Sequence, residues 1–100
     1  MEEFQRVLEG LKAKVEQSKP LDGKLKMVVK GYPVIVIDGT SGINQLIQED
    51  ISADCEIHVA PETIKQMRDG KLNPMKAIIR RKIKIKGDMS MALQLKNFLS

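Results

Sequence analysis

Apolar residues near the start of the chain repeat with the period of an α-helix. They are separated by one to four positions, and charged residues fill most of the positions between them. These apolar residues are Phe4, Val7, Leu8, Leu11 and Val15. The spacing places them on one face, so it predicts an amphipathic helix over residues 4–15 that buries this face against the rest of the protein.

The pattern then changes to the two-residue alternation of β-strands. After the Asp22-Gly23 turn, Leu25 and Met27 alternate with lysines. Strands of this kind are predicted over residues 24–30, 33–38, 43–48 and 53–59. The first two are so close in sequence that we expect them to pair in antiparallel orientation.

The second half of the chain combines short helices with one more strand. Pro61 suits the first position of a helix that Gly70 ends, and Pro74 repeats the start signal. Residues 82–86 predict a strand whose isoleucines face inward and whose lysines face outward. Asp88 is a good N-cap for a final helix.

The order of these elements predicts the fold class. A helix, four strands, two short helices, a strand and a final helix indicate an α+β protein whose helices gather on one face of its sheet. The chain has 100 residues, of which 42% are hydrophobic and 30% charged. These values are ordinary for a globular protein, so we predict a single domain over residues 1–100.

The final helix is more apolar than one buried face requires. Apolar side chains go more than halfway around it and leave a narrow polar stripe. They are Met89, Met91, Ala92, Leu93, Leu95, Phe98 and Leu99. Three interpretations stay open: the helix packs into ordinary core, it pairs with a second copy or another protein, or it covers a ligand pocket. Methionine side chains suit adaptable packing around ligands of varying shape.

A local cluster of cations accounts for a mild basic bias. Seventeen Lys and Arg residues stand against thirteen Asp and Glu residues, which gives a net charge of +4. The residues assigned to membrane contact are Arg80, Arg81, Lys82, Lys84 and Lys86. They suit transient contact with an anionic membrane, and the alternative is a solvated strand face that protects a sheet edge. Nucleic acid is disfavoured, because the chain has only two Phe, one Tyr and no Trp on which bases stack.

Residue types that carry catalysis or bind metal are scarce. Cys55 points to the core by strand alternation, and His58 lies on the opposite face, so the two form no nucleophile and base pair. A second histidine for a transition-metal site is missing, as is a glycine-rich nucleotide motif. We therefore predict no catalytic residue, no metal, no cofactor and no enzyme activity. The single cysteine and the lack of an apolar stretch of membrane-spanning length favour a cytoplasmic protein.

Motifs in the second half of the chain follow one another at fixed spacing. GKLNP at residues 70–74 is followed by Ala77, by KIKIKGDM at residues 82–89, and by Ala92 and Leu93. A glycine-ended helix, a proline-started helix, a basic strand and a Gly-Asp cap thus occur in a fairly specific order. This series resembles the sterol carrier protein type 2 family.

The resemblance implies a fold, a function and a site. The implied fold is a five-stranded, mostly antiparallel mixed sheet with helices on one face that enclose an apolar tunnel. The implied function is that of a carrier binding fatty acid, acyl-CoA, phospholipid or sterol under the C-terminal helix. Arg81 stands where the family commonly has glycine, and aliphatic Ile78 and Ile79 favour acyl chains over sterols. The predicted ligand-binding residues are Met67, Leu72, Met75, Ile78, Ile79, Ile83, Ile85, Met89, Met91, Leu93, Leu95 and Phe98.

Two other functions fit the same residues. A non-catalytic interaction module would dimerise through the apolar C-terminal helix, so a homodimer is an alternative to a lipid-bound monomer. A small basic RNA-binding domain would use the lysines of residues 82–86. Lipid in extracts of the purified protein would separate the carrier from both alternatives.

Overall fold

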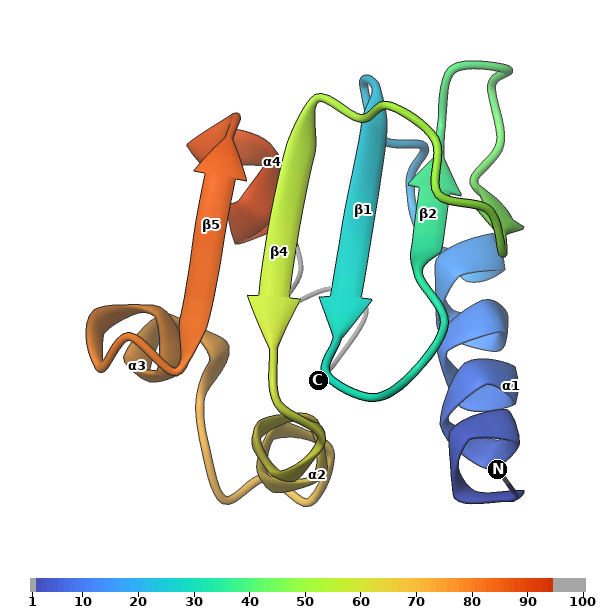
Figure 1. Cartoon of the computed structure of the whole chain (residues 1–100). Helices are drawn as coiled ribbons and strands as arrows, with labels where there is room; N and C mark the ends of the chain where they lie inside the picture. The colour runs from blue at the N-terminus through green and yellow to red at the C-terminus, as the bar shows by residue number, and fades with distance from the viewer. Residues whose placement is uncertain (1, 95–100) are drawn as a thin grey trace.

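The alternating segments of the sequence form a five-stranded sheet in the computed structural model, which describes residues 2–94 (Figure 1). The strands are β1 (Lys24–Val29), β2 (Ile35–Asp38), β3 (Gln45–Ile47), β4 (Cys55–Val59) and β5 (Ile83–Gly87). The helices are α1 (Glu2–Gln17), α2 (Pro61–Arg68), α3 (Pro74–Ile79) and α4 (Met89–Leu93). Each predicted element is therefore present, and β2, β3 and β4 are shorter than the sequence pattern indicates. No helix within residues 2–94 has the length and apolar character needed to cross a membrane.

Strand pairing places β1 and β4 side by side at the centre of the sheet. The order across the sheet is β3-β2-β1-β4-β5. β1 pairs with β2 in antiparallel orientation, as their close spacing predicts, and with β4 in parallel orientation. β4 and β5 pair in antiparallel orientation. The sheet is therefore mixed and mostly antiparallel, which confirms the predicted α+β fold.

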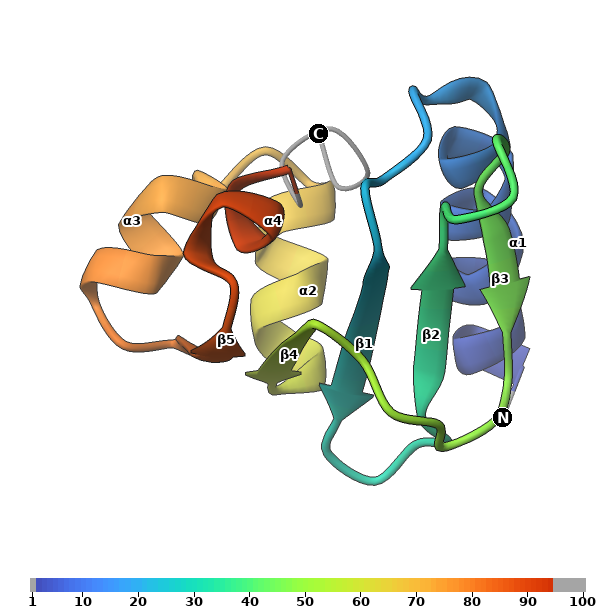
Figure 2. The ribbon, with the colours of Figure 1, turned by 90° about the horizontal axis from the view of Figure 1, so that it is seen from above.

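All four helices lie on one face of the sheet (Figure 2). α1 packs against β3, while α4 packs against β4 and β5. The apolar face predicted for α1 is buried at Leu8, Leu11 and Val15. On the strands, side chains at alternate positions, such as Met27 and Ile57, are buried beneath the helices. The hydrophobic core therefore fills the space between the helices and this face.

The opposite face of the sheet is partly covered by the connection between β3 and β4. Residues 48–54 cross this face over β2 (Figures 1 and 2). Lys26 Nζ lies 2.7 Å from Asp50 Oδ1, which holds the connection to β1. Val36, on the same face, is fully buried. The face over β1, β4 and β5 lies beyond this connection.

The two short helices α2 and α3 end in the same type of turn. At the end of α2, Gly70 has a φ of 73° and Lys71 N–H donates to the Gln66 carbonyl at 2.8 Å. At the end of α3, Arg81 has a φ of 60° and Lys82 N–H donates to the Ala77 carbonyl at 2.9 Å. Both are Schellman motifs, in which the residue in the left-handed conformation is usually glycine. Arg81 is therefore in a conformation that an L-residue adopts only at a cost in free energy.

The last described helix begins where the sequence predicts. The carboxylate of Asp88 accepts the backbone N–H groups of Ser90 at 3.0 Å and Met91 at 3.4 Å, so Asp88 is the N-cap of α4. Just before it, Gly87 has a φ of 98°, and a side chain there would collide with the backbone carbonyl of Asp54. Predictions for Leu95 and Phe98 fall outside the described residues.

Candidate functional site

An apolar layer lies between strands β4 and β5 on one side and helices α2, α3 and α4 on the other. From the sheet it contains Ile57, Val59 and Ile83, which are at most 6% exposed. From the helical side it contains Ile64, Met67, Leu72, Ala77, Met91 and Ala92, all of them buried. The only buried polar side chains in the described part of the chain are Asn44 and Thr63. The layer therefore offers dispersion and burial of apolar surface, with few directional contacts.

The predicted ligand-binding residues divide into a buried and an exposed group. Met67, Leu72, Ile83 and Met91 are buried in the layer, and Ile78 and Ile85 pack against it while partly buried. The exposed residues are Met75 (44% exposed), Ile79 (75%), Met89 (52%) and Leu93 (39%). The structure thus brings the first group together inside the protein and places the second on its surface. Their contact with a ligand stays a prediction.

A groove of about 660 Å³ lies on the other face of the sheet. Its residues are Val28, Lys30, His58, Val59, Ala60, Arg81, Lys82, Lys84 and Lys86. It therefore contains every predicted membrane-contact residue except Arg80, which is exposed beside it in sequence. We call this feature the basic groove.

Strand register explains how the basic groove forms. Val28 of β1, His58 of β4 and Lys84 of β5 are direct neighbours across the three strands. Alternation points the lysines of β5 away from the layer that holds Ile83, as the sequence predicts. The local sequence pattern does not identify Val28 and Lys30 as groove residues, because it carries no sign of the parallel pairing between β1 and β4.

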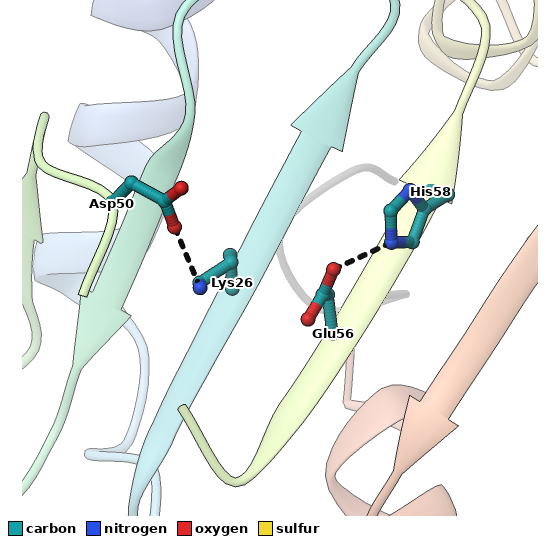
Figure 3. A network of polar contacts seen from close by, with 4 residues as sticks. All are labelled: Lys26, Asp50, Glu56 and His58. Atoms are coloured by element: carbon teal, nitrogen blue, oxygen red, sulfur yellow. Dashed lines mark hydrogen bonds and ion pairs between the residues drawn. The ribbon is translucent and has the colours of Figure 1, made fainter. Parts of the chain in front are cut away.

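The polar contacts on this face that Figure 3 shows involve none of the lysines and arginines of the groove. His58 Nε2 lies 2.6 Å from Glu56 Oε1 on the same strand. Among the residues that the structure describes, Lys30, Arg81, Lys82, Lys84 and Lys86 form no ion pair. The groove is therefore a surface of unneutralised positive charge that also contains the apolar side chains of Val28 and Ala60.

Groups that carry out covalent chemistry have no suitable surroundings in the described structure. Burial in the core raises the pKa of the Cys55 thiol, so it stays protonated at neutral pH. The bond between His58 and Glu56 lies on the opposite face of β4, which keeps the histidine from the thiol. Residues 2–94 contain no cluster of His, Cys, Asp or Glu that is arranged to hold a metal ion. What these residues offer is an apolar interior and a cationic exterior.

Comparison with known proteins connects this arrangement to a family. The family model described as the SCP-2 sterol transfer family matches residues 4–100. Sterol carrier protein 2 of Gallus gallus is 31% identical over 101 residues, and the match covers 94% of this chain and 18% of that protein. The chain thus spans less than a fifth of the length of this relative.

Solved structures with the same fold come from Aedes aegypti. The crystal structure of Sterol Carrier Protein 2 Like 2 has a TM-score of 0.75 and 21% identity, with 93% of both chains covered. The solution structure of palmitated SCP2L2 has a TM-score of 0.75 and 19% identity, with 95% of this chain and 92% of that chain covered. These two confirm the fold, and the family match extends over nearly the whole sequence. The chain belongs to the SCP-2 sterol transfer family.

Proposed function

We propose that this protein is a non-catalytic lipid carrier that holds an acyl chain in the apolar layer between its sheet and α2 to α4. The observation that carries the proposal is the composition of that layer. Met67 and Met91 are buried in this layer beside aliphatic side chains. The chain also belongs to a family whose description names sterol transfer. Flexible thioether side chains repack around ligands of different shape more readily than branched ones do.

The energetics of burial suit pick-up and release. Transfer of each CH₂ group from water to an apolar environment gains about 0.8 kcal/mol, so a sixteen-carbon chain gains roughly 12 kcal/mol. A bilayer interior offers nearly the same gain. A carrier that binds by apolar contact alone therefore holds its lipid at a free energy close to that in the membrane, and the lipid exchanges between the two.

The lining favours acyl chains over flat ring systems. Every apolar residue described as buried is aliphatic, methionine, cysteine or alanine. Rigid rings gain from stacking on aromatic faces, whereas flexible chains require only apolar volume. The palmitated SCP2L2 from Aedes aegypti, which has the same fold, supports the proposal that a fatty acyl chain is the ligand class.

The cations predicted for membrane contact complete the proposed carrier. Arg80, Arg81, Lys82, Lys84 and Lys86 are all exposed. Each cation near an anionic bilayer contributes about 1 kcal/mol, which favours short-lived binding over permanent attachment. A carrier needs such transient contact to reach its lipid.

Organic extraction of the freshly purified protein, followed by mass spectrometry of the extract, tests the proposal. We expect lipid with an acyl chain in a near one-to-one ratio to protein, and native mass spectrometry should show the complex. Protein that binds no lipid from mixed fatty acid, phospholipid and sterol vesicles would overturn the proposal.

A matched pair of variants tests whether the apolar layer is the site. Ala77 is fully buried on α3, whereas Ala13 is exposed on α1. Ala77→Leu adds three carbons inside the layer, and Ala13→Leu adds them outside it. We expect A77L to retain about tenfold less lipid than wild type, because 1.4 kcal/mol of lost binding is a tenfold effect. A13L should retain the wild-type amount, and equal retention by both variants would place the ligand elsewhere.

A further inference from the structure

β5 is an outermost strand of the sheet, and its outer side has no strand beside it. It stands at one end of the strand order and pairs only with β4 (Figure 1). α3 and the turn after it lead into its first residue, so they lie near the start of the strand. An outermost strand of this kind presents a row of backbone donors and acceptors that another chain can bind.

Hydrogen bonding with β4 determines which backbone groups of β5 point outward. Asp88 N–H donates to the Asp54 carbonyl at 3.1 Å, directly after the last pair of the β4–β5 ladder. In an antiparallel pair, successive residues direct their backbone groups alternately toward the neighbouring strand and away from it. Counting back from Asp88, the N–H groups of Ile85 and Gly87 and the carbonyl of Ile85 therefore point outward. No hydrogen bond from another described residue reaches them there.

Side chains of the same strand differ on its two faces. Lys82, Lys84 and Lys86 are exposed on one face and form no ion pair within the described part of the chain. Ile85 lies on the helical face, partly buried against the core. We call these three lysines, Ile85 and Gly87 the β5 edge. Because they follow one another along one strand, a single added strand would contact all of them, with side chains about 5 Å apart across the pair.

We propose that the β5 edge binds an extended segment of a partner protein that has acidic residues at alternate positions. The segment adds a further strand to the sheet. Its backbone pairs with the outward groups of Ile85 and Gly87, its carboxylates lie beside the lysines, and the apolar side chains between them lie beside Ile85. The proposal does not depend on the carrier function, and it identifies the kind of protein that this domain meets.

An acidic strand fits the β5 edge better than other occupants do. Lysines on an outermost strand repel basic strands and disfavour uncharged ones, so they prevent unspecific pairing and select an acidic segment. A second copy of β5 would place lysine beside lysine. Phosphates of RNA neutralise lysines, but they offer no donor to the outward carbonyl of Ile85, which would then face negatively charged oxygens.

Fluorescence anisotropy with short labelled peptides tests the choice of occupant. The probe is the acetylated peptide Glu-Val-Glu-Val-Glu. The control, Glu-Glu-Val-Val-Glu, has the same composition and charge without the alternation. We expect the full chain to bind the probe about fivefold more tightly, because only the probe places all its acids beside the lysines and an exposed ion pair contributes up to about fivefold. Equal binding of both peptides would indicate general charge attraction and overturn the proposal.

Charge-matched variants test the location. K82Q/K84Q/K86Q removes the lysines of the β5 edge, and R6Q/K12Q/K19Q removes equal charge in and after α1, at the opposite end of the sheet (Figure 1). We expect the first variant to bind the probe about tenfold less tightly, since three exposed ion pairs are lost. The second should bind within about twofold of wild type, because its charges are screened from the β5 edge. Equal losses in the two variants would contradict the location.

Backbone methylation of the probe tests strand pairing. Alternate amides of a strand face the same neighbour, so methylating the valine amides removes the donors on one side and methylating the glutamate amides removes those on the other. We expect one methylated peptide to lose binding and the other to retain it. Equal behaviour of the two, whether binding is kept or lost, would exclude an added strand.

Amide hydrogen exchange followed by NMR tests which residues pair. The outward N–H groups of Ile85 and Gly87 should exchange rapidly in the free protein. With the probe at ten times its dissociation constant, we expect about tenfold slower exchange at both positions. The amide of Gly42, between β2 and β3, should keep its rate. Unchanged exchange at Ile85 and Gly87 in the presence of bound probe would place the peptide elsewhere.

The outcomes separate this inference from the carrier function. The peptide measurements use protein from which lipid has been extracted, and the extract itself is the test of the carrier. Failure of the probe to bind would overturn the acidic strand and leave the carrier unaffected. A lipid-free extract together with alternation-dependent binding of the probe would do the reverse. Circular dichroism melting verifies that each variant is folded.

Discussion

The backbone N–H of Leu21 donates a buried hydrogen bond to the side-chain Oδ1 of Asn44 at 2.8 Å. The amide nitrogen of the same side chain donates to the carbonyls of Val15 at 3.1 Å and Lys19 at 2.9 Å. Asn44 is 4% exposed, and its bonds to the Leu21 N–H and the Val15 carbonyl are buried. One side chain therefore holds the end of α1 and the segment after it against the start of β3.

Replacing Asn44 by leucine should destabilise the protein strongly. The change keeps the volume but leaves the buried Leu21 N–H without a partner and removes the bonds to the Val15 and Lys19 carbonyls, at a cost of about 1–3 kcal/mol for a buried group left unpaired. We expect the free energy of unfolding to fall by roughly 3 kcal/mol in urea titrations followed by circular dichroism. Gln45→Leu, at the exposed neighbouring position, should change it by less than about 0.5 kcal/mol. A loss of similar size in both variants would contradict the anchoring role.

Arg81→Gly should stabilise the fold while it weakens membrane binding. Glycine adopts a φ of 60° without steric cost, so the variant should gain about 1 kcal/mol in the free energy of unfolding. Arg80→Gly is the matched control, because Arg80 has an ordinary φ of −81° and glycine there adds only chain entropy to the unfolded state. We expect R80G to be less stable than wild type.

Vesicle binding of the same variant gives the functional half of the prediction. R81G should bind phosphatidylserine vesicles about fivefold less tightly, since one groove cation is lost. A higher free energy of unfolding together with weaker vesicle binding in R81G would indicate that Arg81 serves membrane contact through its charge at a cost in stability. Weaker stability in R81G would show that the side chain of Arg81 supports the fold instead.

The sequence predicted those features that depend on neighbours along the chain. Alternation correctly assigned Ile83 to the core and Lys84 to the opposite face, and it did so because successive strand residues point to opposite sides of a sheet. The N-cap at Asp88 was also predicted correctly, because its partners lie two and three residues further along the chain. The parallel pairing that brings Val28 beside His58 joins residues thirty positions apart, and no local pattern specifies it.

The extent to which the core covers a helix was the other feature that the local sequence could not predict. Met75, Ile78 and Ile79 share an apolar pattern, and the sequence assigned all of them to the ligand site. In the structure Ile79 is 75% exposed, because α3 lies at the edge of the sheet, where nothing in the described chain covers its outer side. A helical period tells which residues share a face, but it does not tell how much of the helix the core covers.

The decrease of folding stability at acid pH should depend on Asp88. Hydrogen bonds from the Ser90 hydroxyl and from the backbone N–H of Met91 lower the pKa of this carboxyl group in the folded state. A lowered folded pKa means that the charged form stabilises the fold above the ordinary value of about 3.9 and that this contribution is lost as pH falls through the folded pKa. Hydrogen bonds from Thr40 lower the pKa of Asp38 in the same direction.

Asp88→Asn separates titration from capping. Asparagine still accepts the backbone N–H groups of α4 but carries no charge to lose. We expect urea midpoints of D88N to fall less than those of wild type between neutral pH and about pH 3, where the ordinary carboxyl group protonates. Parallel curves for the two proteins would show that Asp88 does not contribute to acid sensitivity.

Cys55 should report opening of the apolar layer. Burial raises the pKa of its thiol, and the side chain is 1% exposed, so alkylation requires the structure to open. We expect iodoacetamide to modify native protein at least about a hundredfold more slowly than urea-unfolded protein, given ordinary domain stabilities. Fast modification under native conditions would mean that β4 opens to solvent without global unfolding.

Lipid should raise the melting temperature of delipidated protein, because a ligand that binds only the folded state adds its binding free energy to stability. At a hundred times the dissociation constant this addition is about 2.7 kcal/mol, which for a domain of this size is a shift of roughly 10 °C or more. We expect hexadecanoate to produce such a shift in thermal denaturation of wild type and A13L. A77L should show little shift, since leucine at this buried position occupies volume that the chain needs. The same shift in A77L would mean that the acyl chain binds outside the layer beneath α3, and the exposed side chains of α3 and α4, which are Met75, Ile79, Met89 and Leu93, would then be the next candidates for its contact.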